Sequence, residues 1–174
     1  MAKYATVPVI NALSDKYHPL QTLADLLTLK EYFNNKLAGK TLVWIGDGNN
    51  VLHDLMVGAL KVGMHVKIAT PSAYRPDEQV LQTAHLLAQD SNLSLQMTNN
   101  PREVIKGAHV VVTDTWISMG QEKEAKQRKE DFKGYQIDSE MMRLADPTAV
   151  FLHCLPRKPE EVTDEVGYHL SISI

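Results

Sequence analysis

Residues 41–50 read Thr-Leu-Val-Trp-Ile-Gly-Asp-Gly-Asn-Asn, and this stretch decides the fold. A short apolar, partly β-branched run lies here between Gly39 and Gly46. A run without polar alternation is typical of a strand that is buried on both faces of a parallel sheet. We therefore expect a buried strand at residues 41–45, with a glycine turn directly after it.

Four further runs have the same character, at residues 66–69, 93–97, 110–113 and 149–152. Helical patterns separate the runs, at residues 51–62, 77–89, 102–106 and 122–132. This alternation predicts an α/β fold with a mainly parallel sheet, right-handed crossovers and helices on both faces. Ligands bind such sheets at the carboxyl ends of the strands, so the residues after each strand are the candidates for chemistry.

A helix is expected before the first strand. Pro19 suits a first helical position, and apolar residues then recur at helical spacing up to a stop at Gly39, namely Leu20, Leu23, Ala24 and Leu27. His18 would lie at the N-cap and Gln21 in the first turn, beside unpaired N–H groups. A capping histidine is the simpler interpretation, and an oxygen or anion site is the functional one.

Composition limits the class of protein. The 174 residues are 44% hydrophobic and 22% charged, as expected of one globular domain. A net charge of -3 provides no basic surface for nucleic acid, and no apolar run approaches the length of a membrane span. The single cysteine, Cys154, excludes an internal disulfide and a zinc site of several thiolates. Residues 1–8 resemble neither a secretory signal nor an Arg-rich transit peptide.

The glycine turn after the first strand invites a dinucleotide interpretation. Val51 stands where a third glycine would fall, and the second strand ends Ala69-Thr70 without a carboxylate for a ribose. The turn is better suited to bringing asparagine side chains to the mouth of the sheet. For Asn50 itself, a helix cap is the simpler interpretation.

Polar side chains also follow the fourth and fifth strands. Asp114 is followed by Ser118-Met119-Gly120, a combination that suits an ammonium ligand, although Asp114 could instead cap a helix. Cys154 would reach the same rim, either for packing or for chemistry. We interpret the acidic and basic residues 122–131 as a solvated helix face, and five isolated histidines as structural, namely His53, His65, His85, His109 and His169.

Taken together, four segments resemble, in order, the motifs of ornithine carbamoyltransferases. These are His18-Pro-Leu-Gln21, Trp44-Ile-Gly-Asp-Gly-Asn-Asn50, Asp114-Thr-Trp-Ile-Ser-Met-Gly120 and His153-Cys-Leu-Pro156. The resemblance extends from about Val7 to Val166 and implies the Rossmann-like second domain of that family. The sequence Arg157-Lys-Pro-Glu-Glu161 is similar to the animal mitochondrial enzymes, which implies the mitochondrial matrix and the urea cycle or arginine biosynthesis. A cytoplasmic location is the alternative.

The resemblance implies transfer of a carbamoyl group from carbamoyl phosphate to L-ornithine, giving citrulline and phosphate. Asn50 and the backbone at Met119 would hold the ornithine carboxylate, and Asp114 and Ser118 its α-ammonium group. Cys154 would lie beside the reacting amine. We expect it to act as a thiolate base, assisted by Asp114, or only to position the amine.

On the carbamoyl side, the resemblance implies that His18 and Gln21 hold the oxygen and nitrogen of the carbamoyl group, with the carbonyls of Cys154 and Leu155. No metal and no organic cofactor is expected. The family forms a homotrimer, and no nucleic-acid partner is expected.

Two departures from the family shape the expected organisation. First, the family's phosphate-binding loop belongs to an earlier domain that this sequence does not show, and the arginines here are dispersed: Arg75, Arg102, Arg128, Arg143 and Arg157. Second, residues 167–174 do not match the family's pattern. We predict an interdomain start at 1–36, an ornithine-binding domain at 37–166 and a divergent tail at 167–174. We expect the isolated chain to have no carbamoyltransferase activity. The alternatives are a non-catalytic amino-acid-binding or regulatory fragment, and an NAD(P)-dependent oxidoreductase.

Overall fold

Five parallel strands form one sheet in the computed structural model, which describes residues 2–169. Their spatial order is β3-β2-β1-β4-β5, and their bounds are β1 Thr41–Ile45, β2 His65–Ala69, β3 Leu95–Thr98, β4 Val110–Val112 and β5 Val150–Leu152. In the register, Trp44 of β1 pairs with Ile68 on one side and with Val112 on the other. All five strands thus end at the same edge, and the strand order reverses direction between β1 and β4.

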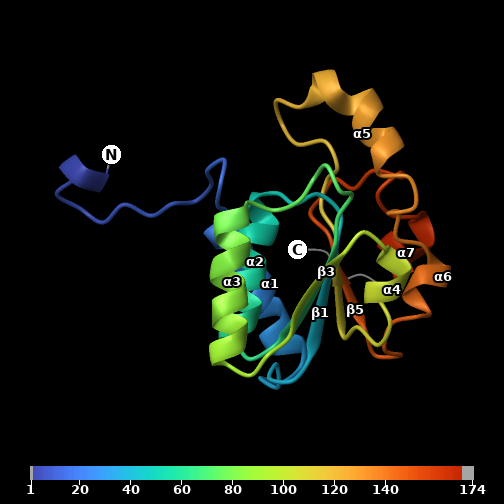
Figure 1. Cartoon of the computed structure of the whole chain (residues 1–174), viewed down its shortest axis with the longest axis horizontal. Helices are drawn as coiled ribbons and strands as arrows, with labels where there is room; N and C mark the ends of the chain where they lie inside the picture. Colours follow the sequence, from blue (N-terminus) through green and yellow to red (C-terminus); the bar gives the residue numbers. More distant parts are fainter. Residues whose placement is uncertain (1, 170–174) are drawn as a thin grey trace.

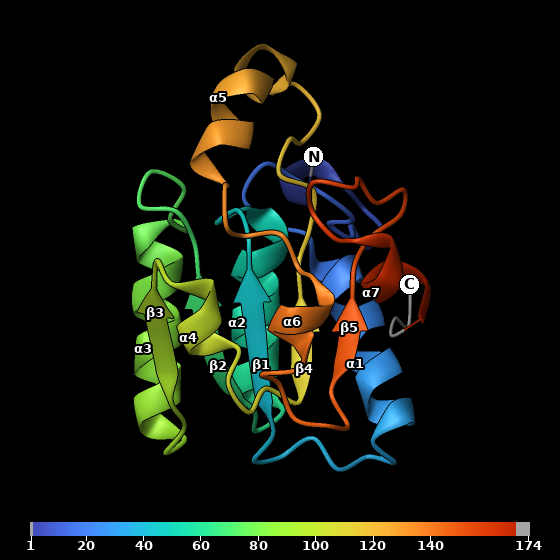
Figure 2. The same ribbon diagram turned by 90° about the vertical axis from the view of Figure 1, so that its right-hand side faces the viewer.

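Helices cover both faces of the sheet (Figures 1 and 2). One face carries α1 (Pro19–Tyr32), α2 (Asn50–Lys61) and α3 (Glu78–Asp90). The other carries the short helices α4 (Pro101–Val104), α6 (Ser139–Met142) and α7 (Asp164–His169). The 3-10 turn η2 (Glu122–Glu124) and helix α5 (Ala125–Asp131) project beyond the carboxyl ends of the strands (Figure 2). Another 3-10 turn, η1 (Ala2–Tyr4), begins the described chain.

The predicted α/β fold is confirmed, with each expected strand present within two residues of its predicted bounds. The first helix is shorter than expected. It ends at Tyr32 rather than near Gly39, because Asn34 and Asn35 take positive φ angles of 50° and 63°. Asparagine tolerates this left-handed conformation better than most residues, so it can end a helix as glycine does.

Strand β1 divides its side chains between two cores. Leu42 and Trp44 pack with α1, α2 and α3, while Val43 and Ile45 belong to the core on the opposite face. All four are fully buried. This burial on both faces explains why the strand is a continuous apolar run instead of an alternating one.

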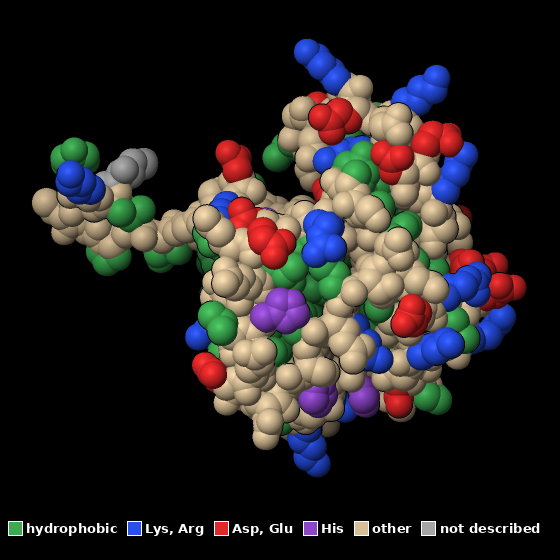
Figure 3. Space-filling model, in the orientation of Figure 1, with side chains coloured by type: hydrophobic (Ala, Val, Ile, Leu, Met, Phe, Trp, Pro, Cys, Tyr) green, Lys and Arg blue, Asp and Glu red, His purple; other side chains and the backbone are tan. Residues whose placement is uncertain are grey.

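The leucine stripe of α1 faces outward. Leu20, Leu23 and Leu27 are 44%, 62% and 56% exposed, whereas Asp25 and Leu29 of the same helix are buried. Periodicity identified the helix but could not tell which of its faces meets the sheet. Exposed apolar side chains continue along residues 4–17, on the arm that extends away from the body of the molecule (Figures 1 and 3). Within residues 2–169, no helix is long and apolar enough to cross a bilayer.

Candidate functional site

A cavity of about 1070 Å³ opens at the carboxyl ends of β1, β4 and β5. The start of α1 and the loop before α5 complete its wall. All eight candidate residues from the sequence line this one cavity: His18, Gln21, Asn50, Asp114, Ser118, Met119, Cys154 and Leu155. The position next to the reversal of strand order is where open α/β sheets bind ligands.

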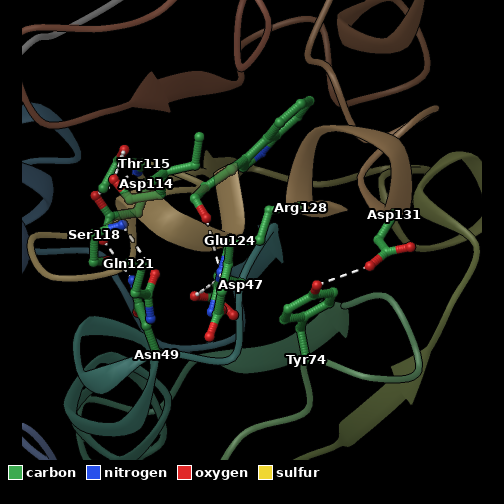
Figure 4. Close-up of polar contacts among 12 residues, drawn as sticks. Asp47, Asn49, Tyr74, Asp114, Thr115, Ser118, Gln121, Glu124, Arg128 and Asp131 are labelled. Carbon is green, nitrogen blue, oxygen red and sulfur yellow. Dashed lines mark hydrogen bonds and ion pairs between the residues drawn. The ribbon is translucent and has the colours of Figure 1, made fainter. Parts of the chain in front are cut away.

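Asp114 lies at the centre of the cavity wall. Its carboxylate accepts hydrogen bonds from Asn49 Nδ2 at 2.7 Å, from the Thr115 backbone N–H at 2.7 Å and from Cys154 Sγ at 2.9 Å. Figure 4 shows Asn49 and Asp114 facing each other across the loops that follow β1 and β4. Asp114 is only 8% exposed and forms no ion pair with any residue of the described chain. Its negative charge therefore remains available to a cationic ligand.

The environment of Cys154 opposes the thiolate that we expected. Burial and the negative charge of Asp114 raise the pKa of this thiol to about 12. Cys154 is therefore a neutral thiol at neutral pH and donates to Asp114 instead of accepting a proton. The placement of the thiol beside the acidic loop agrees with the sequence expectation, and of the two roles expected for Cys154 the raised pKa favours positioning over the thiolate base.

The two asparagines after β1 have different contacts from those expected. Asn49, not Asn50, is the N-cap of α2, and its side chain accepts from the N–H groups of Val51 and Leu52 at 3.1 Å each. Asn50 is the first residue of the helix and donates to the Ser14 carbonyl at 2.8 Å. The interpretation of Asn50 as the cap was wrong by one residue, because both residues suit a cap and only backbone geometry separates them.

Gly48 allows two loops to approach closely. A Cβ atom at this position would lie 2.3 Å from the backbone of Arg75 and Pro76, and the Gly48 N–H donates to the Tyr74 carbonyl at 2.9 Å. The second glycine of the turn therefore permits contact between the loops that follow β1 and β2.

His18 is the N-cap residue before α1, as predicted, but its ring makes no capping hydrogen bond. Its backbone N–H donates to Asp54 Oδ2 of α2 at 2.6 Å, and its Nδ1 atom is buried without a hydrogen-bond partner among the described residues. One turn later, Gln21 Nε2 donates to Asp25 Oδ1 at 2.8 Å. The capping interpretation of His18 was therefore wrong. The ring instead places at the cavity wall a nitrogen that has no hydrogen-bond partner in the described chain.

Ser118 and Met119 belong to a loop that is held by its own side chains. The Ser118 N–H donates to Gln121 Oε1 at 3.0 Å, and Figure 4 shows both residues beside Asn49 and Asp114. Met119 is 90% exposed, so its side chain makes little contact with the rest of the described chain.

Arg128 corrects the prediction of a fully solvated helix at residues 122–131. It is 6% exposed and donates to Asp47 Oδ2 at 2.9 Å and to the Trp116 carbonyl at 3.0 Å. Its guanidinium also lies 4.6 Å from the centre of the Tyr74 ring (Figure 4). Burial raises the pKa of Asp47 although Arg128 opposes that shift. One arginine therefore joins α5 to the loops after β1, β2 and β4.

Glu161 is a second buried charged residue whose contacts sequence reasoning missed. It is fully buried, and it accepts from the Trp116 N–H and the Thr115 hydroxyl, each at 3.0 Å, and from the Lys158 N–H at 3.1 Å. His153 Nε2 lies 3.3 Å from the same carboxylate. Glu161 thereby ties the loop that carries Asp114 to the loop that carries Cys154. Its only sequence signal is a glutamate pair, which is commonplace on protein surfaces.

Three of the isolated histidines have structural contacts, as predicted. His53 accepts from the Asp77 N–H and contacts the Lys16 carbonyl, each at 2.8 Å. His65 and His109 accept from backbone N–H groups of Ser94 and Thr41. His85 is exposed, and the His169 side chain lies outside the described residues. Within residues 2–169, no group of three His, Cys, Asp or Glu side chains is placed to hold a metal ion.

Comparison with known proteins covers almost the whole sequence. Residues 38–171 match the family model "Aspartate/ornithine carbamoyltransferase, Asp/Orn binding domain", and residues 1–31 match the carbamoyl-P binding domain of the same family. Mitochondrial ornithine carbamoyltransferase of Aquarana catesbeiana is 54% identical over 168 residues, which are 97% of this chain and 48% of that protein. Mitochondrial ornithine transcarbamylase of Gallus gallus is also 54% identical over 168 residues, covering 97% of this chain and 47% of its own length.

Solved structures agree with the sequence comparison. Ornithine carbamoyltransferase of Pyrococcus furiosus has a TM-score of 0.92 at 44% identity, with 99% of this chain and 55% of that chain covered. A mitochondrial ornithine carbamoyltransferase of Coccidioides immitis has a TM-score of 0.88 at 40% identity, with 99% and 55% covered. The chain spans about half the length of the curated relatives it matches.

Proposed function

The chain belongs to the aspartate/ornithine carbamoyltransferase family, and from this membership we propose that its cavity is the L-ornithine site of an ornithine carbamoyltransferase. The reaction moves a carbamoyl group from carbamoyl phosphate to the side-chain amine of L-ornithine, giving L-citrulline and phosphate. The observation that carries the proposal is the Asp114 carboxylate at the wall of the cavity. It has no ion-pair partner among the described residues, and hydrogen bonds from Asn49 and Cys154 hold it in place.

Recognition of the amino-acid end follows from charge. Asp114, with the Ser118 hydroxyl, takes the α-ammonium group of ornithine through charge-assisted hydrogen bonds. Asn50 and the backbone at Met119 hold its carboxylate. Two buried acidic groups of the cavity wall, Asp25 and Asp114, lack an ion-pair partner among the described residues, which supports a cationic ligand.

The reacting amine must lose a proton before it attacks the carbamoyl carbon, because a free side-chain amine has a pKa of about 10.4. The raised pKa of Cys154 favours a positioning role for the neutral thiol over a role as base. We assign the proton-accepting role to the Asp114 carboxylate, which already holds the thiol at 2.9 Å.

The carbamoyl group of the second substrate contacts His18, Gln21 and the carbonyls of Cys154 and Leu155. The unpartnered Nδ1 of His18 supports this assignment, since a buried ring nitrogen without a partner is costly unless a ligand satisfies it. The Cys154 carbonyl is already contacted by the His153 ring. A carbonyl has two lone pairs, so one remains for the ligand.

We further propose an interdomain start at residues 1–36, an ornithine-binding domain at 37–166 and a tail at 167–174, of which 170–174 lie outside the described residues. The change of matching family model between residues 31 and 38 supports the first boundary. The names of the animal relatives support a mitochondrial location, for which we propose the matrix. A homotrimer is the proposed assembly.

Calorimetry with L-norvaline, which has the α-ammonium and carboxylate groups but no side-chain amine, tests the amino-acid site. We expect binding by the wild-type chain and at least about tenfold weaker binding by Asp114→Asn, the loss expected for a charge-assisted hydrogen bond. Asp90→Asn changes an exposed aspartate and should bind as wild type does. Absence of heat with the wild-type chain, or equal affinity in Asp114→Asn, would refute the assignment.

A citrulline assay with L-ornithine and carbamoyl phosphate tests the reaction itself. Binding of norvaline without citrulline formation would favour the alternative of a non-catalytic amino-acid-binding chain. Adding the carbamoyl-P domain of a relative in trans then tests whether the cavity supports transfer.

A further inference from the structure

Asp25 is a buried carboxylate with one hydrogen-bond partner among the described residues. It is 4% exposed, lines the same cavity as Asp114, and accepts from Gln21 Nε2 at 2.8 Å, one turn earlier on α1. Within residues 2–169 it forms no ion pair. Burying a carboxylate with a single hydrogen-bond donor and no cation is costly, which calls for a function beyond packing.

The chemistry of this contact fixes the amide of Gln21. An ionised carboxylate can only accept hydrogen bonds, so Gln21 must turn its NH₂ group toward Asp25. The amide oxygen, Oε1, is then left for the cavity, and no residue of the described chain donates to it. A protonated Asp25 could instead donate to Oε1, and the amide would then present its NH₂ group to the cavity.

We propose that Asp25 is a positioning residue that holds the oxygen of the Gln21 amide toward the cavity and thereby selects a ligand with an N–H group at that point. The inference rests on the proposed function and deepens it. The NH₂ group of carbamoyl phosphate donates to Oε1, whereas the methyl group of acetyl phosphate leaves that oxygen without a partner. A site that hydrogen-bonds a donor rejects an analogue that lacks it.

The charge state of Asp25 responds to its surroundings. Burial, with the charge of Asp114 adding to it, raises the pKa of Asp25 to about 6, while the Gln21 hydrogen bond opposes the shift. The other titratable groups of the cavity come from every segment around it: Asp15 on the N-terminal arm, His18 at the N-cap of α1, His53 on α2, Asp47 after β1, Tyr74 after β2, and His153 and Cys154 after β5. Its cations are Arg75, Arg128, which is paired with Asp47, and Lys158, which is paired with Glu161.

Nuclear magnetic resonance tests the contact without any ligand. The side-chain NH₂ signal of Gln21, identified by its loss in Gln21→Met, is followed over about two pH units on either side of the Asp25 pKa. We expect the signal to titrate with that pKa in the wild-type chain and in Asp90→Asn, a control at an exposed aspartate. It should be independent of pH in Asp25→Asn. An unchanging wild-type signal, or the same titration in Asp25→Asn, overturns the proposal.

Binding measurements test the selection. At a pH above the Asp25 pKa, calorimetry compares carbamoyl phosphate with acetyl phosphate. We expect the preference for carbamoyl phosphate to fall about tenfold in Asp25→Asn, as for loss of one hydrogen bond to a ligand, and to persist in Asp90→Asn. An unchanged preference overturns the selective role. If the wild-type chain binds neither phosphate nor L-norvaline while the Gln21 signal still follows Asp25, the proposed function fails and the coupling of the two side chains stands.

Discussion

Asp25 and Glu161 are two buried carboxylates near the same cavity with opposite charge behaviour. Burial raises the pKa of Asp25 to about 6, and Asp114 adds to the rise. Burial also acts to raise the pKa of Glu161, but His153, the Trp116 N–H and Lys158 outweigh it and lower that pKa. Both residues are less than 5% exposed. The difference teaches that donors and cations around a carboxylate, rather than depth alone, decide its charge state.

Removing the charge of Glu161 should have the largest effect on the stability of the fold. Glu161→Gln leaves Lys158 and several N–H and O–H donors without their carboxylate, and we expect the free energy of unfolding to fall by about 3–5 kcal/mol. Urea denaturation followed by circular dichroism measures the loss. Glu160→Gln is the matched control, because its partner Lys129 is 53% exposed, and it should cost less than about 1 kcal/mol. Equal losses in the two variants would contradict the distinction.

Arg128→Met would make Asp47 resemble Asp25, a buried carboxylate without a cation. We expect the free energy of unfolding to fall by about 3 kcal/mol, because one partner of a buried ion pair remains. Arg102→Met, at an exposed pair with Glu140, should change stability by less than about 1 kcal/mol when measured in the same urea titrations. A small loss in Arg128→Met would show that solvent reaches Asp47.

Asp25→Asn should stabilise the chain. Above its pKa of about 6, ionised Asp25 destabilises the folded state by about 3 kcal/mol relative to the protonated form. The neutral amide removes this cost, and we expect a gain of about 1–3 kcal/mol at neutral pH. A decrease in stability at neutral pH would mean that the Asp25 charge is compensated.

The pH dependence of stability separates the two carboxylates further. The folded state holds the Asp25 proton more tightly than the unfolded state, so this group's contribution is full below its ordinary pKa of 3.8 and is lost as pH rises through about 6. Asp25→Asn should remove that decline. Glu161 acts in the reverse direction, because its lowered pKa gives stability that is lost as pH falls. Urea midpoints of wild type and Asp25→Asn at matched pH values measure the difference.

The smallest expected effect concerns a donor to Asp114. Asn49→Ala removes the cap of α2, and Asp77→Ala removes the cap of α3, each at about 1 kcal/mol. Only Asn49 also donates to Asp114. Thermal unfolding should therefore show similar losses, whereas calorimetry should show weaker L-norvaline binding in Asn49→Ala alone. Equal affinities would show that Asp114 needs no support from Asn49.

Local patterns were sufficient for the sheet and for part of the site. The strand at residues 41–45 has the predicted bounds, because a short apolar run between glycines is compatible with few structures other than a buried strand. Asp114 and Cys154 were expected on one rim because the carboxyl ends of parallel strands share an edge, and β4 and β5 are indeed neighbours.

The contacts that support the site depend on partners far apart in sequence. Arg128 and Glu161 stand in charged runs that look solvent-exposed, and their partners, Asp47 and Trp116, lie 81 and 45 residues away. Helices α6 and α7 contain four and six residues. Such lengths are too short to show a helical period, so these helices were not predicted.

The division of β1 side chains between two cores also separates the two tryptophans. Trp44 is fully buried among α1, α2 and α3, and Trp116 is 4% exposed in the opposite core, stacked on Phe132 at 5.2 Å. A chain with only one of these indoles would carry an optical reporter for one layer of the molecule. Because Trp116 follows Asp114 by two residues, its emission would also register movement of the acidic loop.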